Sequence, residues 1–214
     1  MTSSHHGLFV DLDGTLADSI SVMRAVYDRF LVGFGKRGSD AEFSRLNGPP
    51  LTEILVDLAR THDLSQPLPS LLSTYQTLIE AAYRNVAPNS GASDLLQSAR
   101  DHGLRVGVVT SNASSLTRAW LQRVNLDLNV DVIVGGDDVS AGKPDPEPYR
   151  LALQRSGCTA AASFAVEDST TGARAAIDAG IRTFFLSATP DAICDGATTV
   201  TCLQDVEKNL AGDR

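Results

Sequence analysis

The chain has 214 residues, of which 43% are hydrophobic and 21% charged, and its net charge is −8. This composition predicts a globular protein with a full core, and the negative charge disfavours a nucleic-acid or membrane partner. The sequence lacks both a run of roughly 20 apolar residues that could cross a membrane and the pattern of a signal peptide. We therefore expect a cytoplasmic protein with Cys158, Cys194 and Cys202 as reduced thiols.

The first predicted element is a short apolar strand at residues 7–10, preceded by His5 and His6 in what we expect to be a solvated tail. Asp11 and Asp13 follow the strand directly in the segment DLDGT. Two carboxylates at the end of a buried strand are costly unless a cation compensates them. An EF-hand calcium loop starting at Asp11 would require a glutamate at its twelfth position, which is Val22.

Residues 18–88 show the apolar spacing of helices and no convincing strand. The helical patterns cover residues 19–35, 51–62 and 68–86. About 70 residues are too many for a simple crossover between two strands. We therefore expect a helical cap domain at 18–88, inserted into a core domain formed by 1–17 and 89–214.

From residue 105 onward, apolar strands alternate with helices. Strands are predicted at 105–111, 130–136, 163–169 and 181–188, with a short edge strand at 197–203. Helices are predicted at 115–124 with Ser114 or Ser115 as N-cap, at 145–157 with Asp145 as N-cap and Pro146 in the first position, at 171–180, and at 204–212. This alternation predicts an α/β fold with a doubly wound, mostly parallel sheet.

Ligands of such sheets bind beyond the carboxyl ends of the strands, so polar residues that follow the strands are candidates for the site. These candidates are Asp11, Asp13, Thr110, Ser111, Asn112, Lys143, Glu167 and Asp168. Four carboxylates, a hydroxyl and an ammonium from four separate parts of the chain would converge there, and a divalent cation with hard oxygen ligands would offset the negative charge. Mg²⁺ is the cofactor that this pattern favours.

In order and spacing, these segments resemble the four motifs of the haloacid dehalogenase (HAD) superfamily over essentially the whole chain. DLDGT is similar to the first motif, Thr110 to the second, Lys143 before PDP to the third, and VEDS at 166–169 to the fourth. The helical insertion after the first motif and the segment NGPPLTEIL resemble the phosphoglycolate phosphatase-like branch. The resemblance implies a HAD-like Rossmannoid core with a cap domain.

The resemblance also implies a role for each candidate residue in a Mg²⁺-dependent phosphatase acting on a small phosphorylated metabolite. Asp11 would be the nucleophile that forms an aspartyl-phosphate, and Asp13 the general acid and base. Thr110, with backbone N–H groups around Ser111 and Asn112, would hold the phosphate. Lys143 would neutralise charge on the phosphate and on Asp11. Asp11, the backbone carbonyl of Asp13, Asp168 and nearby Glu167 would hold the metal.

Three alternative functions are weaker. A β-phosphoglucomutase-type enzyme would share the motifs, but it would carry a histidine and an arginine where this chain has Met23 and Leu51. A 2-haloacid dehalogenase would need neither Asp13 nor the acidic pair at 167–168. A phospho-accepting receiver or ligand-binding module would lack the inserted cap.

The sequence leaves the substrate open among phosphoglycolate, sugar phosphates, nucleotides and pyrophosphate. Arg24, Arg45, Asn47 and Arg60 are candidate substrate contacts in the cap, although a solvated helix surface would carry the same residues. No oligomeric state is predicted.

Overall fold

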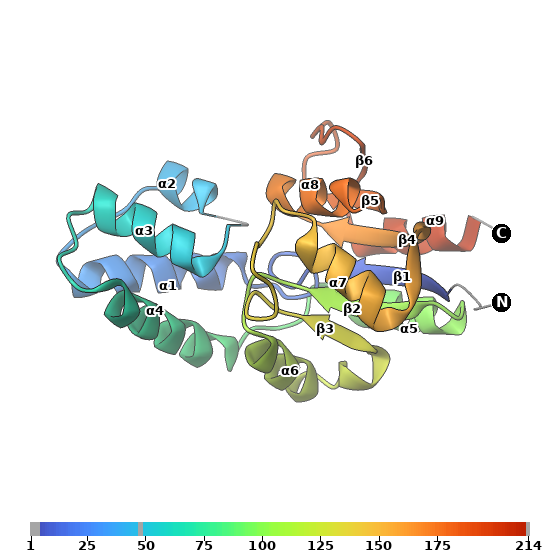
Figure 1. Cartoon of the computed structure of the whole chain (residues 1–214), viewed down its shortest axis with the longest axis horizontal. Coiled ribbons are helices and arrows are strands. Elements are labelled where there is room, and N and C mark those ends of the chain that lie inside the picture. Colours follow the sequence, from blue (N-terminus) through green and yellow to red (C-terminus); the bar gives the residue numbers. More distant parts are fainter. Residues whose placement is uncertain (1–4, 47–48, 213–214) are drawn as a thin grey trace.

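The computed structural model describes residues 5–46 and 49–212, and a single parallel sheet organises its larger part (Figure 1). The strands are β1 His5–Val10, β2 Arg105–Val109, β3 Val132–Val134, β4 Cys158–Glu167, β5 Arg182–Leu186 and β6 Ala197–Val200. They lie in the order β3-β2-β1-β4-β5-β6, and each neighbouring pair is parallel. The predicted α/β class is thus confirmed, with β6 at an edge as expected.

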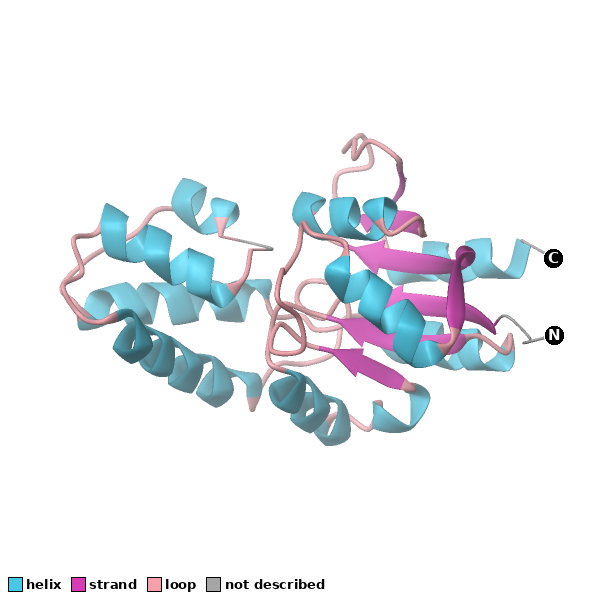
Figure 2. Cartoon of the chain, viewed as in Figure 1, coloured by secondary structure: helices cyan, strands magenta, loops and turns pink. Residues whose placement is uncertain are grey.

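Helices cover both faces of this sheet (Figure 2). They are α5 Ala92–Asp101, α6 Ser114–Arg123, α7 Glu147–Ser156, α8 Thr170–Asp178 and α9 Leu203–Gly212, with a 3-10 turn at Asp127–Asn129. Successive β1 side chains point to opposite faces, as a strand requires. Leu8 and Val10 belong to the hydrophobic cluster that also holds side chains of α5, α6 and α9, whereas Phe9 packs with those of α7 and α8.

The remaining helices lie together beyond the carboxyl ends of the strands (Figure 1). They are α1 Ile20–Gly33, α2 Asp40–Arg45, α3 Leu51–Thr61 and α4 Leu68–Tyr83. Their buried side chains pack on one another, for example Phe30 of α1 against Tyr75 of α4 with ring centroids 4.9 Å apart. The three helical patterns predicted in this segment are all present.

Two chain segments connect these four helices to the sheet, and they run side by side. The N–H of Asp18 donates to the carbonyl of Ala87 at 2.9 Å, and the N–H of Asn89 donates to the carbonyl of Leu16 at 2.8 Å. The side-chain amide of Asn89 also donates to the carbonyl of Gly14 at 3.0 Å. The returning segment therefore holds the loop that follows β1.

Several predicted element ends are wrong. His5 and His6 have exposed side chains, but their backbone belongs to β1 rather than to a tail. The cap of α6 is neither Ser114 nor Ser115, because Asp137 accepts from the N–H of Ser114 at 2.8 Å. Helix α7 begins at Glu147, one residue later than predicted, so that Pro146 precedes it, although the side chain of Asp145 accepts from Glu147 N–H at 2.8 Å.

The sequence patterns predict neither α2 nor α5. Helix α2 has six residues, and α5 has ten and lies directly after Gly91, whose φ is +84°. A helix of six residues shows few apolar repeats, so the periodicity of α2 is weak. Helix α5 buries Leu95, Leu96 and Ala99 at helical spacing, so its pattern could have predicted it. Cys158, Cys194 and Cys202 form no disulfide in the described part of the chain.

Candidate active site

The site begins where β1 ends. The N–H of Asp11 continues the strand pairing by donating to the carbonyl of Val166 in β4 at 3.0 Å. The chain then turns, with Gly14 at φ +80°, and the N–H of Ala17 donates to the carbonyl of Leu12 at 2.8 Å. This closed loop fixes the carboxylate of Asp11, which is 7% exposed, at the carboxyl edge of the sheet.

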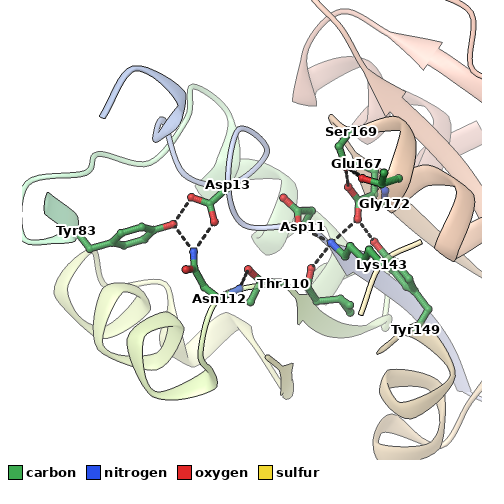
Figure 3. A network of polar contacts seen from close by, with 12 residues as sticks. Asp11, Asp13, Tyr83, Thr110, Asn112, Lys143, Tyr149, Glu167, Ser169 and Gly172 are labelled. Carbon is green, nitrogen blue, oxygen red and sulfur yellow. Dashed lines mark hydrogen bonds and ion pairs between the residues drawn. The ribbon is translucent and has the colours of Figure 1, made fainter. Parts of the chain in front are cut away.

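A buried ammonium faces that carboxylate (Figure 3). Lys143, from the loop between β3 and α7, places Nζ 2.6 Å from Oδ1 of Asp11 and 2.5 Å from Oε1 of Glu167. It also donates to the carbonyl of Val109 at 2.9 Å. Lys143 is 2% exposed. Two carboxylates and one ammonium thus share a site that solvent scarcely reaches.

Glu167 is held as tightly as the lysine. Its Oε1 accepts from the phenol of Tyr149 at 2.6 Å, and its Oε2 accepts from Ser169 at 3.3 Å. A Cβ on Gly172 would lie 2.0 Å from a Glu167 oxygen, so this glycine leaves room for the carboxylate. Neither Tyr149 nor Gly172 was among the predicted site residues.

Burial and charge set the ionisation of this group. Burial lowers the pKa of Lys143, but the charges of Asp11 and Glu167 outweigh that effect and raise it. Burial raises the pKa of Asp11 against the opposing influence of Lys143. Lys143 therefore stays protonated, and it partly compensates two carboxylates that burial would otherwise neutralise.

Asp13 points away from Asp11 and toward Tyr83 of α4 (Figure 3). We call the part of the chain that holds α1–α4 the helical segment. Its Oδ1 accepts from the hydroxyl of Ser19 at 2.7 Å and from the phenol of Tyr83 at 2.5 Å. Its Oδ2 accepts from the side-chain amide of Asn112 at 2.5 Å. Burial and the nearby charge of Asp11 raise the pKa of Asp13. The two aspartates therefore have separate environments, which sequence spacing does not reveal.

The segment after β2 occupies the predicted place. The N–H of Thr110 donates to the carbonyl of Val134, and the side chain of Thr110 is buried. The N–H of Asn112 donates to the Thr110 hydroxyl at 3.1 Å, so this amide already has a partner within the chain. Asn112 was predicted only as a backbone donor, whereas its side chain binds Asp13.

One group of carboxylates fits a metal ion. Oxygen atoms of Asp11, Glu167 and Asp168 lie within 4.8 Å of one another. A Cβ on Gly14 would lie 2.1 Å from Oδ2 of Asp168, so the carboxylate rests against the backbone of the DLDGT loop. An all-oxygen, anionic set of this kind suits a hard divalent cation. Asp11 and Glu167 also bind Lys143, so an ion at this position would share their carboxylates with the ammonium.

Two cavities meet at the site. The smaller, about 110 Å³, is lined by Asp11, Asp13, Lys143 and Asp168 from the sheet side and by side chains of α1–α4. We call it the phosphate chamber. The larger, about 730 Å³, lies between α4 and α6 and is called the crevice cavity. Both are lined by Leu51, Ile79, Ser111 and Asn112, so the two cavities are adjacent.

The three arginines among the candidate substrate contacts are absent from the described lining of both cavities. Arg24 pairs with Asp28 and Asp40, and Arg60 pairs with Asp57. Arg45 reaches the carbonyl of Ala41 in its own helix. These arginines agree with the solvated-surface interpretation rather than with a substrate contact. Asn47 lies outside the described residues.

The chain matches a known protein family. The model of haloacid dehalogenase-like hydrolases matches residues 8–186, which include the loop after β1, Lys143 and the end of β4. The chain belongs to this family. The resemblance seen in the four motifs is therefore confirmed.

Relatives in this hydrolase family differ in their named substrates. The chain is 28% identical to a phosphorylated carbohydrates phosphatase of Thermotoga maritima, over 82% of each protein. It is 27% identical to a phosphoglycolate phosphatase of Pseudomonas fluorescens, over 83% of this chain and 67% of that protein. A crystal structure of β-phosphoglucomutase from Clostridium difficile has a TM-score of 0.85 at 13% identity, covering 97% and 98% of the two chains, which shows the shared fold. Within its described residues, this hydrolase has no helix both long and apolar enough to cross a bilayer.

Proposed function

We propose that the protein is a Mg²⁺-dependent phosphatase that hydrolyses phosphate monoesters through an aspartyl-phosphate on Asp11. The observation that carries the proposal is the buried contact between Lys143 and Asp11 at the carboxyl edge of the sheet. An aspartate attacks a phosphate dianion only where nearby cations offset the repulsion, and Lys143 is one such cation. The names of the phosphatase relatives support the same reaction class.

The first step transfers the phosphoryl group to the protein. An oxygen of Asp11 attacks phosphorus, the bond to the alcohol oxygen breaks, and Asp13 gives its proton to that oxygen. The raised pKa of Asp13 supports its carrying this proton. Thr110 and Ser111, together with Lys143, would hold the other phosphate oxygens.

The second step releases phosphate. Asp13 takes a proton from water, the water oxygen attacks phosphorus, and the bond to Asp11 breaks. Asp11, Asp168, the backbone carbonyl of Asp13 and, less directly, Glu167 would hold Mg²⁺. When bound, the ion would offset the negative charge of the phosphate and the carboxylates. We also propose that residues 18–88 form a cap whose movement admits substrate and excludes water during transfer.

Hydrolysis is favoured over a mutase reaction by two chamber residues. Met23 and Leu51, which stand where the family resemblance implies a histidine and an arginine in mutases, both line the phosphate chamber. Neither side chain can bind the second phosphate of a bisphosphate intermediate. An assay that follows hexose 1-phosphate conversion alongside phosphate release separates the two reactions.

The direct test is phosphate release from p-nitrophenyl phosphate with and without Mg²⁺. We expect Mg²⁺-dependent turnover that Asp11→Asn abolishes, whereas Asp18→Asn, an exposed aspartate near the same loop, retains it. Asp13→Asn should still bind phosphate but lose turnover. Full activity of Asp11→Asn would contradict the proposed nucleophile.

A further inference from the structure

The wall of the phosphate chamber formed by the helical segment is apolar. Met23 of α1, Phe43 of α2, Leu51 and Ile54 of α3, and Ile79 of α4 line it, together with the ring of Tyr75. Among the described residues that line this chamber, Lys143 is the only cation. That ammonium already contacts Asp11 and Glu167. Asn47 and Gly48, which precede the chamber residue Pro49, carry no charge in the sequence.

The sheet side of the chamber is negatively charged. Asp11, Asp13 and Asp168 line it, against the single positive charge of Lys143. The phosphate itself would be compensated by Lys143 and the proposed metal ion. A second anion held inside the chamber would meet apolar side chains on one side and carboxylates on the other. Taking a charge out of water without a partner is strongly unfavourable.

The alcohol has one evident direction in which to extend. Its oxygen must lie within hydrogen-bond reach of Asp13. Asn112, which donates to Asp13 at 2.5 Å, lines both cavities, so the crevice cavity is the neighbouring space into which the alcohol could extend. At about 730 Å³ this cavity has the size of a small-molecule site, whereas the chamber of about 110 Å³ leaves little room beside a phosphate.

The crevice cavity offers no net positive charge to an anion. Among the described residues that line it, the charged ones are Arg84 and Arg123 against Glu80 and Asp137, two of each sign. Arg123 donates to the carbonyl of Val86, which engages part of its guanidinium. Leu72, Leu116 and Trp120 contribute apolar surface between these groups. Such a lining suits a neutral molecule with both hydroxyl and apolar faces.

We infer that the substrates are phosphate monoesters of uncharged alcohols, and that the alcohol occupies the crevice cavity between α4 and α6. This inference rests on the proposed phosphatase function and narrows it. Sugar and polyol monophosphates fit the description. Esters whose alcohol carries a carboxylate or a second phosphate do not.

The charge preference is tested with matched pairs of esters and the unaltered protein in Mg²⁺. Sorbitol 6-phosphate and 6-phosphogluconate are open six-carbon chains that differ in one carboxylate, as do phenyl phosphate and 4-carboxyphenyl phosphate in a rigid frame. We expect kcat/KM to be higher for the neutral ester of each pair by about tenfold or more, or about 1.4 kcal/mol. A smaller ratio in both pairs would overturn the inference.

A charge placed in the chamber should change that preference. Leu51→Lys introduces an ammonium at the half-buried wall shared by the two cavities and should reduce the ratio within each pair by about tenfold. Val56→Lys makes the same change on the exposed face of the same helix, where Val56 is 52% exposed, and should leave the ratios unaltered. Equal ratios in the two variants would contradict the role of the chamber wall.

The place of the alcohol is tested by filling the crevice cavity. Ala119→Trp should raise KM for sorbitol 6-phosphate about tenfold and leave kcat/KM for methyl phosphate, which ends inside the chamber, unchanged. Equal effects on both esters, or no effect, would show that the alcohol does not occupy this cavity. Comparable hydrolysis of all esters would overturn the substrate class but keep the phosphatase. Failure to release phosphate from any of them would overturn both.

Discussion

The phenol of Tyr83 donates a hydrogen bond to the carboxylate of Asp13 at 2.5 Å, although 70 residues separate the two. Tyr83 is the last residue of α4 and is buried, while Asp13 belongs to the loop after β1. Burial and the charge of Asp13 raise the pKa of Tyr83 well above its usual value, so the phenol stays a donor. The proposed proton carrier is therefore oriented by the helical segment.

Removing this hydroxyl should slow turnover while leaving substrate binding intact. Tyr83→Phe keeps the ring in place but removes one of the two hydrogen bonds to Oδ1 of Asp13, which leaves Ser19 alone to hold that oxygen. We therefore expect kcat to fall about tenfold with KM within about twofold. Steady-state kinetics with p-nitrophenyl phosphate measure both. The control is a double-mutant cycle with Asp13→Asn, in which Tyr83→Phe should have no further effect. Additive losses would show that Tyr83 acts independently of Asp13.

Lys143 should contribute to stability as well as to activity. Lys143→Met leaves the buried carboxylates of Asp11 and Glu167 uncompensated, so we expect a loss of about 3–5 kcal/mol in the free energy of unfolding without metal. Glu167→Gln in the same chain should recover part of that loss by removing one of the charges. Urea unfolding at pH 7 in a chelator measures both variants.

An exposed lysine supplies the control for that measurement. Lys208, whose side chain is 75% exposed and pairs with Asp205, should leave the free energy of unfolding unchanged within the error of the measurement when replaced by Met. Equal stability of Lys143→Met and the unaltered protein would mean that the two carboxylates are protonated rather than paired.

Replacing Gly14 should weaken the binding of Mg²⁺ by moving the carboxylate of Asp168. Its φ of +80° and the position of Asp168 Oδ2, 2.1 Å from an added Cβ, mean that Gly14→Ala both strains the loop and displaces this carboxylate. We expect the Mg²⁺ concentration for half-maximal activity to rise about tenfold or more. Gly103 has a similar φ of +74°, and an added Cβ there would have nothing within 4 Å. Gly103→Ala therefore strains the backbone in the same way without displacing a side chain. A similar Mg²⁺ requirement in both variants would show that Asp168 does not bind the metal.

The sequence predicts the parts of this site that lie at strand ends. Asp11, Thr110, Lys143 and Glu167 each follow or end an apolar strand or a turn signal, and parallel strands bring such positions to one edge. The sequence does not predict the direction in which these side chains point. Asp13 turns toward Tyr83 and Asp11 toward Lys143 because of contacts between segments that are far apart in the sequence, which no local pattern encodes.

The helical segment was least predictable for the same reason. Its three longer helices follow from apolar spacing, but the faces they turn toward the site do not. Arg24 and Arg60 are as polar as any substrate contact, yet they pair with aspartates of the helical segment, and the chamber wall is made by Met23 and Leu51 instead. Phe43 of the short helix α2 also lines the chamber, although the sequence pattern of α2 does not predict a helix.

A buried polar cluster holds α2 to its neighbours. Glu42 of α2 is 5% exposed and accepts hydrogen bonds from the phenol of Tyr27 in α1 and from Nε2 of His62, at 2.9 Å, just after α3. Burial raises the pKa of Glu42, but these two partners outweigh burial and leave it below its usual value. The ionised carboxylate therefore stabilises the fold, and the cluster lies behind the chamber residue Phe43.

The pH dependence of stability follows from the sign of that shift. A carboxyl whose pKa is lower in the folded state stabilises the fold, and its contribution to the free energy of unfolding is complete above the unfolded pKa of about 4.3. This contribution is lost as the pH falls through the lower pKa of the folded state. Glu42→Gln should therefore cost about 1–3 kcal/mol at pH 7, and the difference from the unaltered protein should shrink below about pH 4. Urea unfolding between pH 3 and pH 7 measures this difference, with exposed Glu53→Gln as control. A difference that stays constant across that range would mean that the charge of Glu42 does not stabilise α2.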